Sequence, residues 1–424
     1  MTCSEVSDSG GMVRYHSAWL LPITGPPIRD AWIDICDGRI LDFGTMNHRK
    51  PLSRKVRKID LGCTAVLPGL VNAHTHLELS WLRGLVPPTS SLPLWVRSLL
   101  AKRAEAQGDE SEAIVAAIEE SWRSGTAIVG DISNTLDSVI PLSRGRLVSI
   151  VFKEILGFDV ECPEDLVGKA VAMIVNTPSN ERVRLGLAAH SPYSVSPGVF
   201  RSMKLVMGRL GPSPSCVHLA ESKEELEFLR NGTGPWRELL MEKGKGIAHW
   251  EPPNCGPVEY LERLGWINEH VIVVHGVHLT EVELDQLARR NVVLVTCPRS
   301  NAWTGAGTPP IERFYASGVS VAIGTDSLAS APDMNLFSEL AELRCLAPTV
   351  AAATLLKSAT VRGAEAFGFG SDYGSIEPGR LGALISVRIP EVVEDVEEYL
   401  VSGIWPDDVS WLNVGMPGLE SPSD

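Results

Sequence analysis

Two histidines separated by one residue, His74 and His76, end an apolar run in the segment LPGLVNAHTHLELS. Alternate residues of a β-strand face the same side, so the two imidazoles would point in one direction. A third histidine, His218, lies within the apolar segment CVHLA, and Glu221 follows three positions later. Imidazoles spaced in this way are typical ligands of a divalent metal ion.

Three more polar residues end apolar segments farther along the chain: His190 after LGLAA, His275 after VIVV, and Asp326 at the end of VSVAIGTD. Three imidazoles and one carboxylate form an N₃O set that suits zinc, with iron(II) or manganese(II) as alternatives. An open position on such a site holds water, whose pKa falls to ~7 on zinc. The predicted ligands are His74, His76, His218 and Asp326.

The remaining polar residues suggest how that water would react. Glu221 is placed to pass its proton to a leaving group, as a general acid and base. Asp326 could accept the water's proton as well as bind metal, and His275 could hydrogen-bond the nucleophile or polarise the substrate. An isolated strand-end histidine more often has a structural role, but the recurrence of such residues favours a metal site. His278, two residues beyond His275, is expected beside the site or at the surface.

The segments that must position these residues alternate between short apolar runs and longer amphipathic stretches. Helical patterns lie at 111–125, 223–231 and 280–291, between strand candidates. Eight parallel strands separated by helices predict an α/β fold, a (β/α)₈ barrel of the TIM type, whose active site lies at the carboxyl ends of the strands. The strand candidates are 65–73, 126–131, 147–155, 185–190, 216–220, 271–276, 292–297 and 319–326.

Both ends of the chain have β character. Segments 14–23, 31–37 and 38–44 are separated by turn residues, and 374–390 is similar. Residues 335–368 predict two helices, and 396–403 a further strand. We therefore expect residues 1–62 and 373–424 to form a small β-sandwich with a tail, around a barrel of residues 63–372.

Composition limits the classes of partner. The 424 residues are 44% hydrophobic and 21% charged, as in ordinary globular enzymes, and carry a formal net charge of −14. That charge argues against nucleic acid or an anionic membrane as a partner. The eight cysteines include no Cys-x-x-Cys pair, and no run approaches the ~18 apolar residues of a membrane span. We expect a cytoplasmic enzyme with a small-molecule substrate, compatible with a homodimer.

Several segments together resemble the amidohydrolase superfamily, in its branch of cytosine, guanine and S-adenosylhomocysteine deaminases and triazine chlorohydrolases. They are LPGLVNAHTHLELS, AAHSPYSVSP, VHLAES, VVHGVHL, TCPRSNAWTGAG and GTDSLASAPDMNLF. The resemblance implies a one-metal centre on the four predicted ligands, Glu221 as proton shuttle and His275 beside the attacking hydroxide. Binuclear members commonly carry a carboxylated lysine at the end of strand four. This chain has His190 there, which implies a single metal and places His190 near the substrate or nucleophile.

Within that branch, HTHLELS and HSPYSVS are most similar to aminofutalosine deaminases of menaquinone biosynthesis and their relatives. The substrate implied is an adenine nucleoside with a modified ribose, deaminated at C6. Glu78, Arg299 and Asn301 are then candidate substrate contacts, and Glu78 and Arg299 could read a ring edge and an attached carboxylate. The alternative for Glu78 and Arg299 is a structural ion pair at the barrel rim. Asp131 and Glu154 are open to substrate contact or a supporting hydrogen bond.

Three functions are therefore in competition. The leading one is metal-dependent hydrolytic deamination of an aminated heterocycle with release of ammonia. The same centre could instead expel chloride or open a cyclic amide. A non-catalytic scaffold derived from such a barrel is expected to have lost ligands or the acid/base, all of which this sequence retains.

Overall fold

A closed barrel of eight parallel strands forms the centre of the molecule, in a computed structural model that describes residues 11–48, 56–105, 110–211, 213–244, 247 and 250–412. Each strand pairs with the next one in sequence, and a parallel bridge between Thr75 and Asp326 closes the ring. The barrel strands are β6 (Leu70–Thr75), β7 (Thr126–Ser133), β8 (Val148–Ile155), β9 (Val183–Ala189), β10 (Ser215–Leu219), β11 (Val271–His275), β12 (Val293–Thr296) and β13 (Ser320–Ile323).

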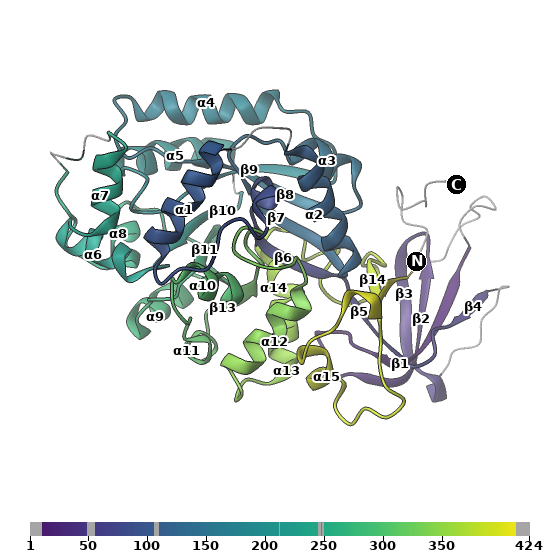
Figure 1. Ribbon diagram of the computed structural model, residues 1–424. Helices are drawn as coiled ribbons and strands as arrows, with labels where there is room; N and C mark the ends of the chain where they lie inside the picture. Colours follow the sequence, from purple (N-terminus) through teal and green to yellow (C-terminus); the bar gives the residue numbers. More distant parts are fainter. Residues whose placement is uncertain are drawn as a thin grey trace.

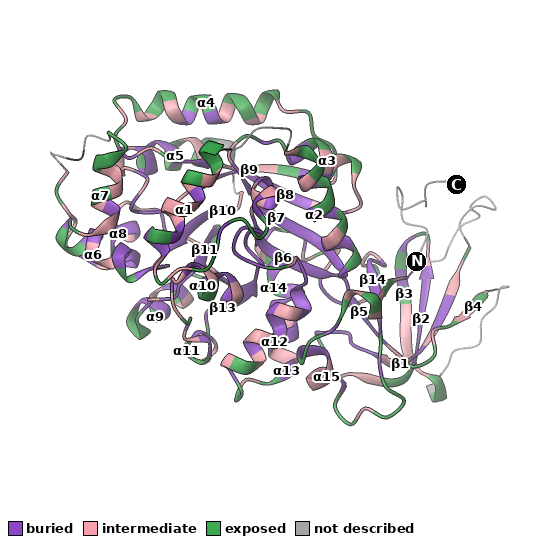
Figure 2. Cartoon of the chain, in the orientation of Figure 1, coloured by how far each residue is buried: buried purple, intermediate pink, exposed green. Residues whose placement is uncertain are grey.

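Helices follow the strands and surround the barrel (Figure 1). The strands are largely buried and the outer helix faces are exposed, as expected where both faces of a parallel sheet are covered (Figure 2). The predicted (β/α)₈ barrel is confirmed. Among the described residues, no helix combines the length and apolar character needed to cross a membrane. The connecting helices are α1 (Leu92–Glu105), α2 (Ser111–Arg123), α3 (Val139–Arg144), α4 (Pro163–Asn176), α5 (Pro197–Leu210), α6 (Lys223–Asn231), α7 (Pro235–Glu242), α8 (Pro257–Arg263), α9 (Glu281–Arg289), α10 (Pro298–Thr304) and α11 (Ile311–Ala316).

A second sheet, beside the barrel, is built from both ends of the chain, as predicted (Figure 1). β14 runs antiparallel to β5, which joins the two ends. Trp411 connects this sheet to the barrel, because its ring stacks on Trp122 of α2 with centroids 3.9 Å apart and its indole N–H donates to the Trp122 carbonyl. The strands are β1 (Val13–Leu20), β2 (Ile28–Cys36), β3 (Arg39–Thr45), β4 (Arg57–Asp60), β5 (Thr64–Pro68), β14 (Leu384–Arg388) and β15 (Val409–Trp411).

The segment 65–73, predicted as one strand, is divided between β5 of the second sheet and β6 of the barrel. The division falls at Pro68 and Gly69. Proline has no N–H for a strand ladder. A Cβ on Gly69 would lie 2.7 Å from the Ala127 Cβ and from the Trp411 ring. The chain therefore changes sheets where only glycine fits.

Two predictions near the C-terminal end are wrong. Residues 396–403 contain a helix, α15 (Val396–Val401), because the Asp395 carboxylate accepts the N–H groups of Glu397 and Glu398 and so caps it. The single helix expected at the end of 335–368 is two helices, α13 (Ala352–Ser358) and α14 (Val361–Ala366). They are separated at Thr360, whose φ of −137° and ψ of −94° lie outside the helical region. α12 (Leu336–Leu346) precedes them.

The closing seam of the barrel is held by a small set of hydrogen bonds. The Asp326 N–H donates to the His74 carbonyl at 3.0 Å. The Asn72 amide donates to the Thr325 hydroxyl at 2.8 Å and accepts the Thr325 N–H at 3.0 Å. Gly324 lies inside this seam, where an added Cβ would stand 2.7 Å from the Cβ and carbonyl oxygen of His74. The seam thus requires glycine at 324.

We predict that Gly324→Ala destabilises the fold by about 1–3 kcal/mol, the usual cost of overpacking a buried position. Urea unfolding followed by circular dichroism measures this change. Gly168→Ala is the matched control, since Gly168 is exposed within α4 and an added Cβ meets nothing within 4 Å. Alanine in a helix interior is favoured over glycine by about 0.5–1 kcal/mol, so the control is expected to stabilise. Equal stability changes in the two variants would contradict the seam's role.

Candidate metal centre

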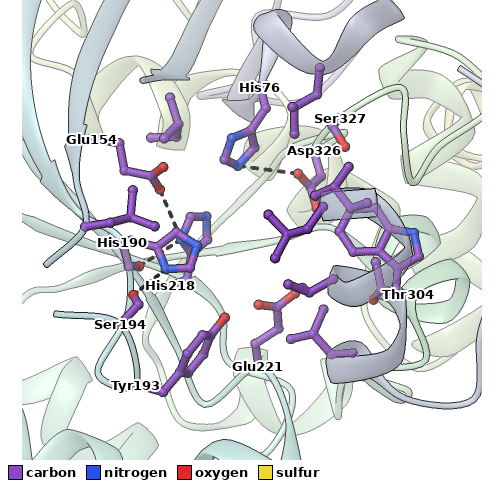
Figure 3. Close-up of a pocket in the computed structure, with 18 of the residues that line it drawn as sticks. His76, Glu154, His190, Tyr193, Ser194, His218, Glu221, Thr304, Asp326 and Ser327 are labelled. Carbon is purple, nitrogen blue, oxygen red and sulfur yellow. Dashed lines mark hydrogen bonds and ion pairs between the residues drawn. The ribbon is translucent and has the colours of Figure 1, made fainter. Parts of the chain in front are cut away.

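The four predicted ligands converge at the carboxyl end of the barrel. His74 lies within β6 and is fully buried, and His76 directly follows that strand. His218 lies in β10, and Asp326 follows β13. Figure 3 shows the side chains of His76, His218 and Asp326 directed at a common space. One donor atom from each of His74, His76 and Asp326 lies within 4.8 Å of the others, and the same is true of His74, His218 and His275.

The distances between these atoms fit a bound cation. The Nε2 atoms of His74 and His218 are 3.3 Å apart, and the Asp326 Oδ1 lies 3.6 Å from His76 Nε2 and 3.8 Å from His74 Nε2. Ligands about 2.0–2.1 Å from a tetrahedral zinc stand roughly 3.3–3.4 Å apart. The His218 Nδ1–H donates to the His190 carbonyl at 2.8 Å, so its Nε2 presents a lone pair to the centre. The donor set therefore suits one divalent ion.

Electrostatics keep these groups in forms that can bind metal. Burial and the neighbouring imidazoles hold the pKa of His74 well below its usual value, so that ring is neutral. Burial likewise lowers the pKa of His218. Burial alone would raise the pKa of Asp326, but the imidazoles of His76 and His275 and a hydrogen bond from Ser300 lower it. These shifts favour the carboxylate form of Asp326 and the neutral forms of His74 and His218.

Glu221 and His275 form a second pair next to the ligands. The Glu221 Oε1 lies 3.6 Å from His275 Nε2, and both side chains are buried. The Asn301 Nδ2 donates to His275 Nδ1 at 3.0 Å, which leaves the Nε2–H of His275 facing Glu221. Burial, the Asp326 carboxylate and Glu225 together raise the pKa of Glu221 well above its usual value. The pair can hold a proton beside the predicted ligands.

A cavity of about 240 Å³ opens from this cluster. Its inner wall is polar and includes His76, His218 and Asp326. Its outer wall is mostly apolar and comes from α1 and α7. Among the lining residues Arg103 of α1 is the one Lys or Arg side chain. The cavity can therefore hold a flat heterocycle against the ligands with its substituent along apolar side chains.

Two of the predicted substrate contacts, His190 and Glu78, line this cavity. The His190 Nδ1 lies 2.6 Å from the Ser194 hydroxyl, and its ring centroid lies 5.1 Å from that of His218. The Glu78 carboxylate is occupied by the backbone N–H groups of Asn134, Thr135 and Leu136 and by hydroxyls of Ser133 and Thr135. Burial would raise the pKa of Glu78, but these hydrogen bonds lower it. Glu78 thus organises the loop after β7 at the cavity wall.

Arg299 and Asn301, the other candidate substrate contacts, are not among the residues that line the cavity. The Arg299 guanidinium pairs with the Glu339 carboxylate at 2.7 Å and with Asp333 at 3.0 Å. Glu339 is fully buried, so Arg299 neutralises a charge between α10 and α12. Arg299 is thus in an ion pair, but with Glu339 and Asp333 and not with Glu78. Asn301 instead orients His275.

Glu154, Asp131 and His278, whose roles the sequence left open, lie in three different places. Glu154 lines the cavity, where its Oε2 accepts from the Asn134 amide at 2.6 Å. Asp131 is fully buried below the cavity, and its carboxylate accepts the Leu77 N–H and the Ser138 hydroxyl. Burial raises the pKa of Asp131 to about 7. His278 contacts the Ala306 carbonyl at 2.8 Å, beside the site rather than in it.

Comparison with known proteins places the chain in a family. The sequence model of the amidohydrolase family matches residues 65–404. A 5-methylthioadenosine/S-adenosylhomocysteine deaminase of Syntrophobacter fumaroxidans is 30% identical over 85% of this chain and 81% of its own length. An aminodeoxyfutalosine deaminase of Deinococcus radiodurans is also 30% identical, over 72% of this chain and 73% of its own.

Solved structures agree with this placement. A zinc-bound adenosine deaminase of Xanthomonas campestris superposes with a TM-score of 0.80 at 25% identity, covering 96% of this chain and 92% of the other. An aminofutalosine deaminase of Helicobacter pylori, 22% identical, shares the fold with a TM-score of 0.82, covering 95% of this chain and 97% of the other. The sequence match over most of the chain, the barrel and the cluster at its carboxyl end agree: this chain belongs to the amidohydrolase family.

Proposed function

We propose that the chain is a hydrolytic deaminase with one divalent cation, zinc in the first place, held by His74, His76, His218 and Asp326. The observation that supports this most directly is the placement of the Glu221–His275 pair beside a cluster of donor atoms, in which His74 Nε2 lies 3.3 Å from His218 Nε2 and 3.8 Å from Asp326 Oδ1. Such a cation, when bound, would lower the pKa of a water molecule and make it a nucleophile at neutral pH.

The residues of this chain would then handle the protons. Glu221, whose pKa burial raises, receives a proton at its carboxylate and delivers it to the amino group that leaves as ammonia. The Nε2–H of His275, fixed by Asn301, donates a hydrogen bond toward the nucleophile. The Asp326 carboxylate, whose Oδ2 accepts the Ser300 hydroxyl, accepts a proton from the water. His190 lies on the cavity wall beside the ring of the substrate.

Adenine nucleosides are the proposed substrate class. The relatives named above are deaminases of methylthioadenosine, S-adenosylhomocysteine, adenosine and aminodeoxyfutalosine. The apolar wall from α1 and α7 offers room for a ribose substituent. Arg103, not Arg299, is the cation available to a charged substituent. Ammonia release from these nucleosides, with guanine and cytosine for comparison, tests the proposal. Chloride release or ring opening without ammonia would support the alternative hydrolases.

We predict that His76→Ala lowers the metal content of the purified protein to well below one ion per chain, because it removes one of four donors. Inductively coupled plasma mass spectrometry measures this loss. The matched control is His278→Ala, since the His278 ring bonds to the Ala306 carbonyl and the backbone N–H that donates to Ala220 is kept in alanine. The control is expected to keep wild-type metal content. Full metal occupancy in His76→Ala would remove that residue from the ligand set.

We predict that Glu221→Gln keeps its metal but loses turnover by about 10²–10⁴-fold, the usual scale for a lost general acid and base. Steady-state ammonia release on the best substrate measures the loss. Glu227→Gln serves as a control on the next helix, because its carboxylate bonds to Thr233 away from the cavity. Unchanged turnover in Glu221→Gln would refute the proton-transfer role. If the metal-loaded wild-type protein releases ammonia from none of the substrates, deamination itself is refuted.

A further inference from the structure

A second buried carboxylate, Glu225, contacts the turn that carries Glu221. Its side chain is fully buried on the first turn of α6. One oxygen accepts the Ala220 N–H at 2.9 Å and the other accepts the Glu221 N–H at 3.2 Å. Both carboxylate oxygens thus bind the backbone on either side of the Ala220–Glu221 peptide. Glu225 does not line the cavity.

This arrangement differs from ordinary helix capping. In α9 the carboxylate of Glu283, at the third helical position, accepts the N–H of its own N-cap residue Thr280 at 3.0 Å. Glu225 occupies the same position in α6, and the N-cap Ser222 hydroxyl accepts its N–H at 3.2 Å. The Glu225 carboxylate, however, bonds to the two residues before the N-cap. It therefore holds the turn between β10 and α6.

That turn needs support because its backbone is strained. Ala220 has a φ of +51°, a left-handed conformation that costs an L-residue free energy. The carbonyls of the turn are bound to the neighbouring strand end, since the His278 N–H donates to the Ala220 carbonyl and the Gly276 N–H to that of Leu219. The N–H groups of Ala220 and Glu221 point the other way, to Glu225. Without that carboxylate, two buried donors would lose their recorded partner.

We propose that Glu225 is a positioning residue that holds the strained Ala220 turn so that the Glu221 carboxyl stays 3.6 Å from His275. The role in turnover rests on the proposed function, in which Glu221 carries the proton. A carboxylate has the two acceptors that the turn requires, whereas an amide of the same shape has one acceptor and an NH₂ group that opposes the second N–H.

The test compares Glu225→Gln with Glu283→Gln in the metal-loaded, full-length protein. Both substitutions weaken the first turn of a helix that follows a barrel strand, but only the first touches the Glu221 turn. We expect Glu225→Gln to keep its metal and its KM within about threefold, and to lose kcat by about 10–100-fold, because small misplacement of a reacting group is costly. Glu283→Gln is expected to keep wild-type kcat.

Two further measurements separate positioning from general damage. Ala220→Gly in the Glu225→Gln background is expected to recover about fivefold in kcat, because glycine adopts positive φ without the cost that alanine bears. Hydrogen–deuterium exchange needs no substrate: the amides of Ala220 and Glu221 are expected to exchange about tenfold faster in Glu225→Gln and at the wild-type rate in Glu283→Gln.

The outcomes distinguish this proposal from the function on which it rests. If no substrate is turned over but the two amides lose protection only in Glu225→Gln, deamination fails and the positioning of the turn stands. Wild-type kcat in Glu225→Gln, equal losses in both glutamine variants, or unchanged exchange would each overturn the proposal. If Glu225→Gln does not fold, Glu225→Asp replaces it, since the shorter carboxylate cannot reach both N–H groups, and the same outcomes apply.

Discussion

The hydrogen bond from the Asp326 N–H to the His74 carbonyl is the contact on which both the barrel and its site depend. It joins the end of the first barrel strand, β6, to the segment that follows the last one, β13. The ring of eight strands is closed there. The two residues that it connects also supply two of the four proposed ligands. Gly324 and Asn72 allow the backbones to approach this closely. The contact that closes the barrel therefore also brings the proposed ligands His74 and Asp326 together. A metal ion bound there would stabilise the closed fold as well.

The protonation states of the site follow from the burial of its titratable side chains. Burial disfavours charge, so it lowers the pKa of the imidazoles of His74 and His218 and raises that of Glu221. Asp326 is the exception, because surrounding imidazoles and the Ser300 hydroxyl stabilise its carboxylate. His74 and His218 thus present neutral nitrogens beside the Asp326 carboxylate, whose charge a divalent cation would more than neutralise. The raised pKa of Glu221 lets it hold a proton beside this cluster, which is the role proposed for it.

The sequence was sufficient for the barrel and for the polar residues gathered at its carboxyl end, because both depend on local patterns. Buried parallel strands are short apolar runs, and a polar residue at the end of each run marks the carboxyl end of the barrel. The split at Gly69 was missed because only the distant Trp411 ring and Ala127 reveal why the chain must turn there. α15 was taken for a strand because its six residues are too few to show a helical period, and the Asp395 cap decides its structure. The role of Arg299 depended on Glu339, forty positions away, whose partner no spacing rule identifies.

The orientation of the site residues was beyond the reach of sequence patterns for a related reason. Three positions at the strand ends, Ala220, His275 and Asp326, adopt positive φ values of 51°, 74° and 59°, although none is glycine. Residue type alone predicts negative φ at these three positions, since a positive φ costs a non-glycine residue free energy. Each of these residues makes a supporting hydrogen bond: the Ala220 N–H donates to Glu225, the His275 ring accepts from Asn301, and the Asp326 N–H donates to the His74 carbonyl. The strain is local, whereas the partners of His275 and Asp326 are distant in sequence. A strand ending in extended backbone would direct its next side chain across the sheet, whereas a left-handed residue turns the chain and aims Glu221, His275 and Asp326 at one cavity.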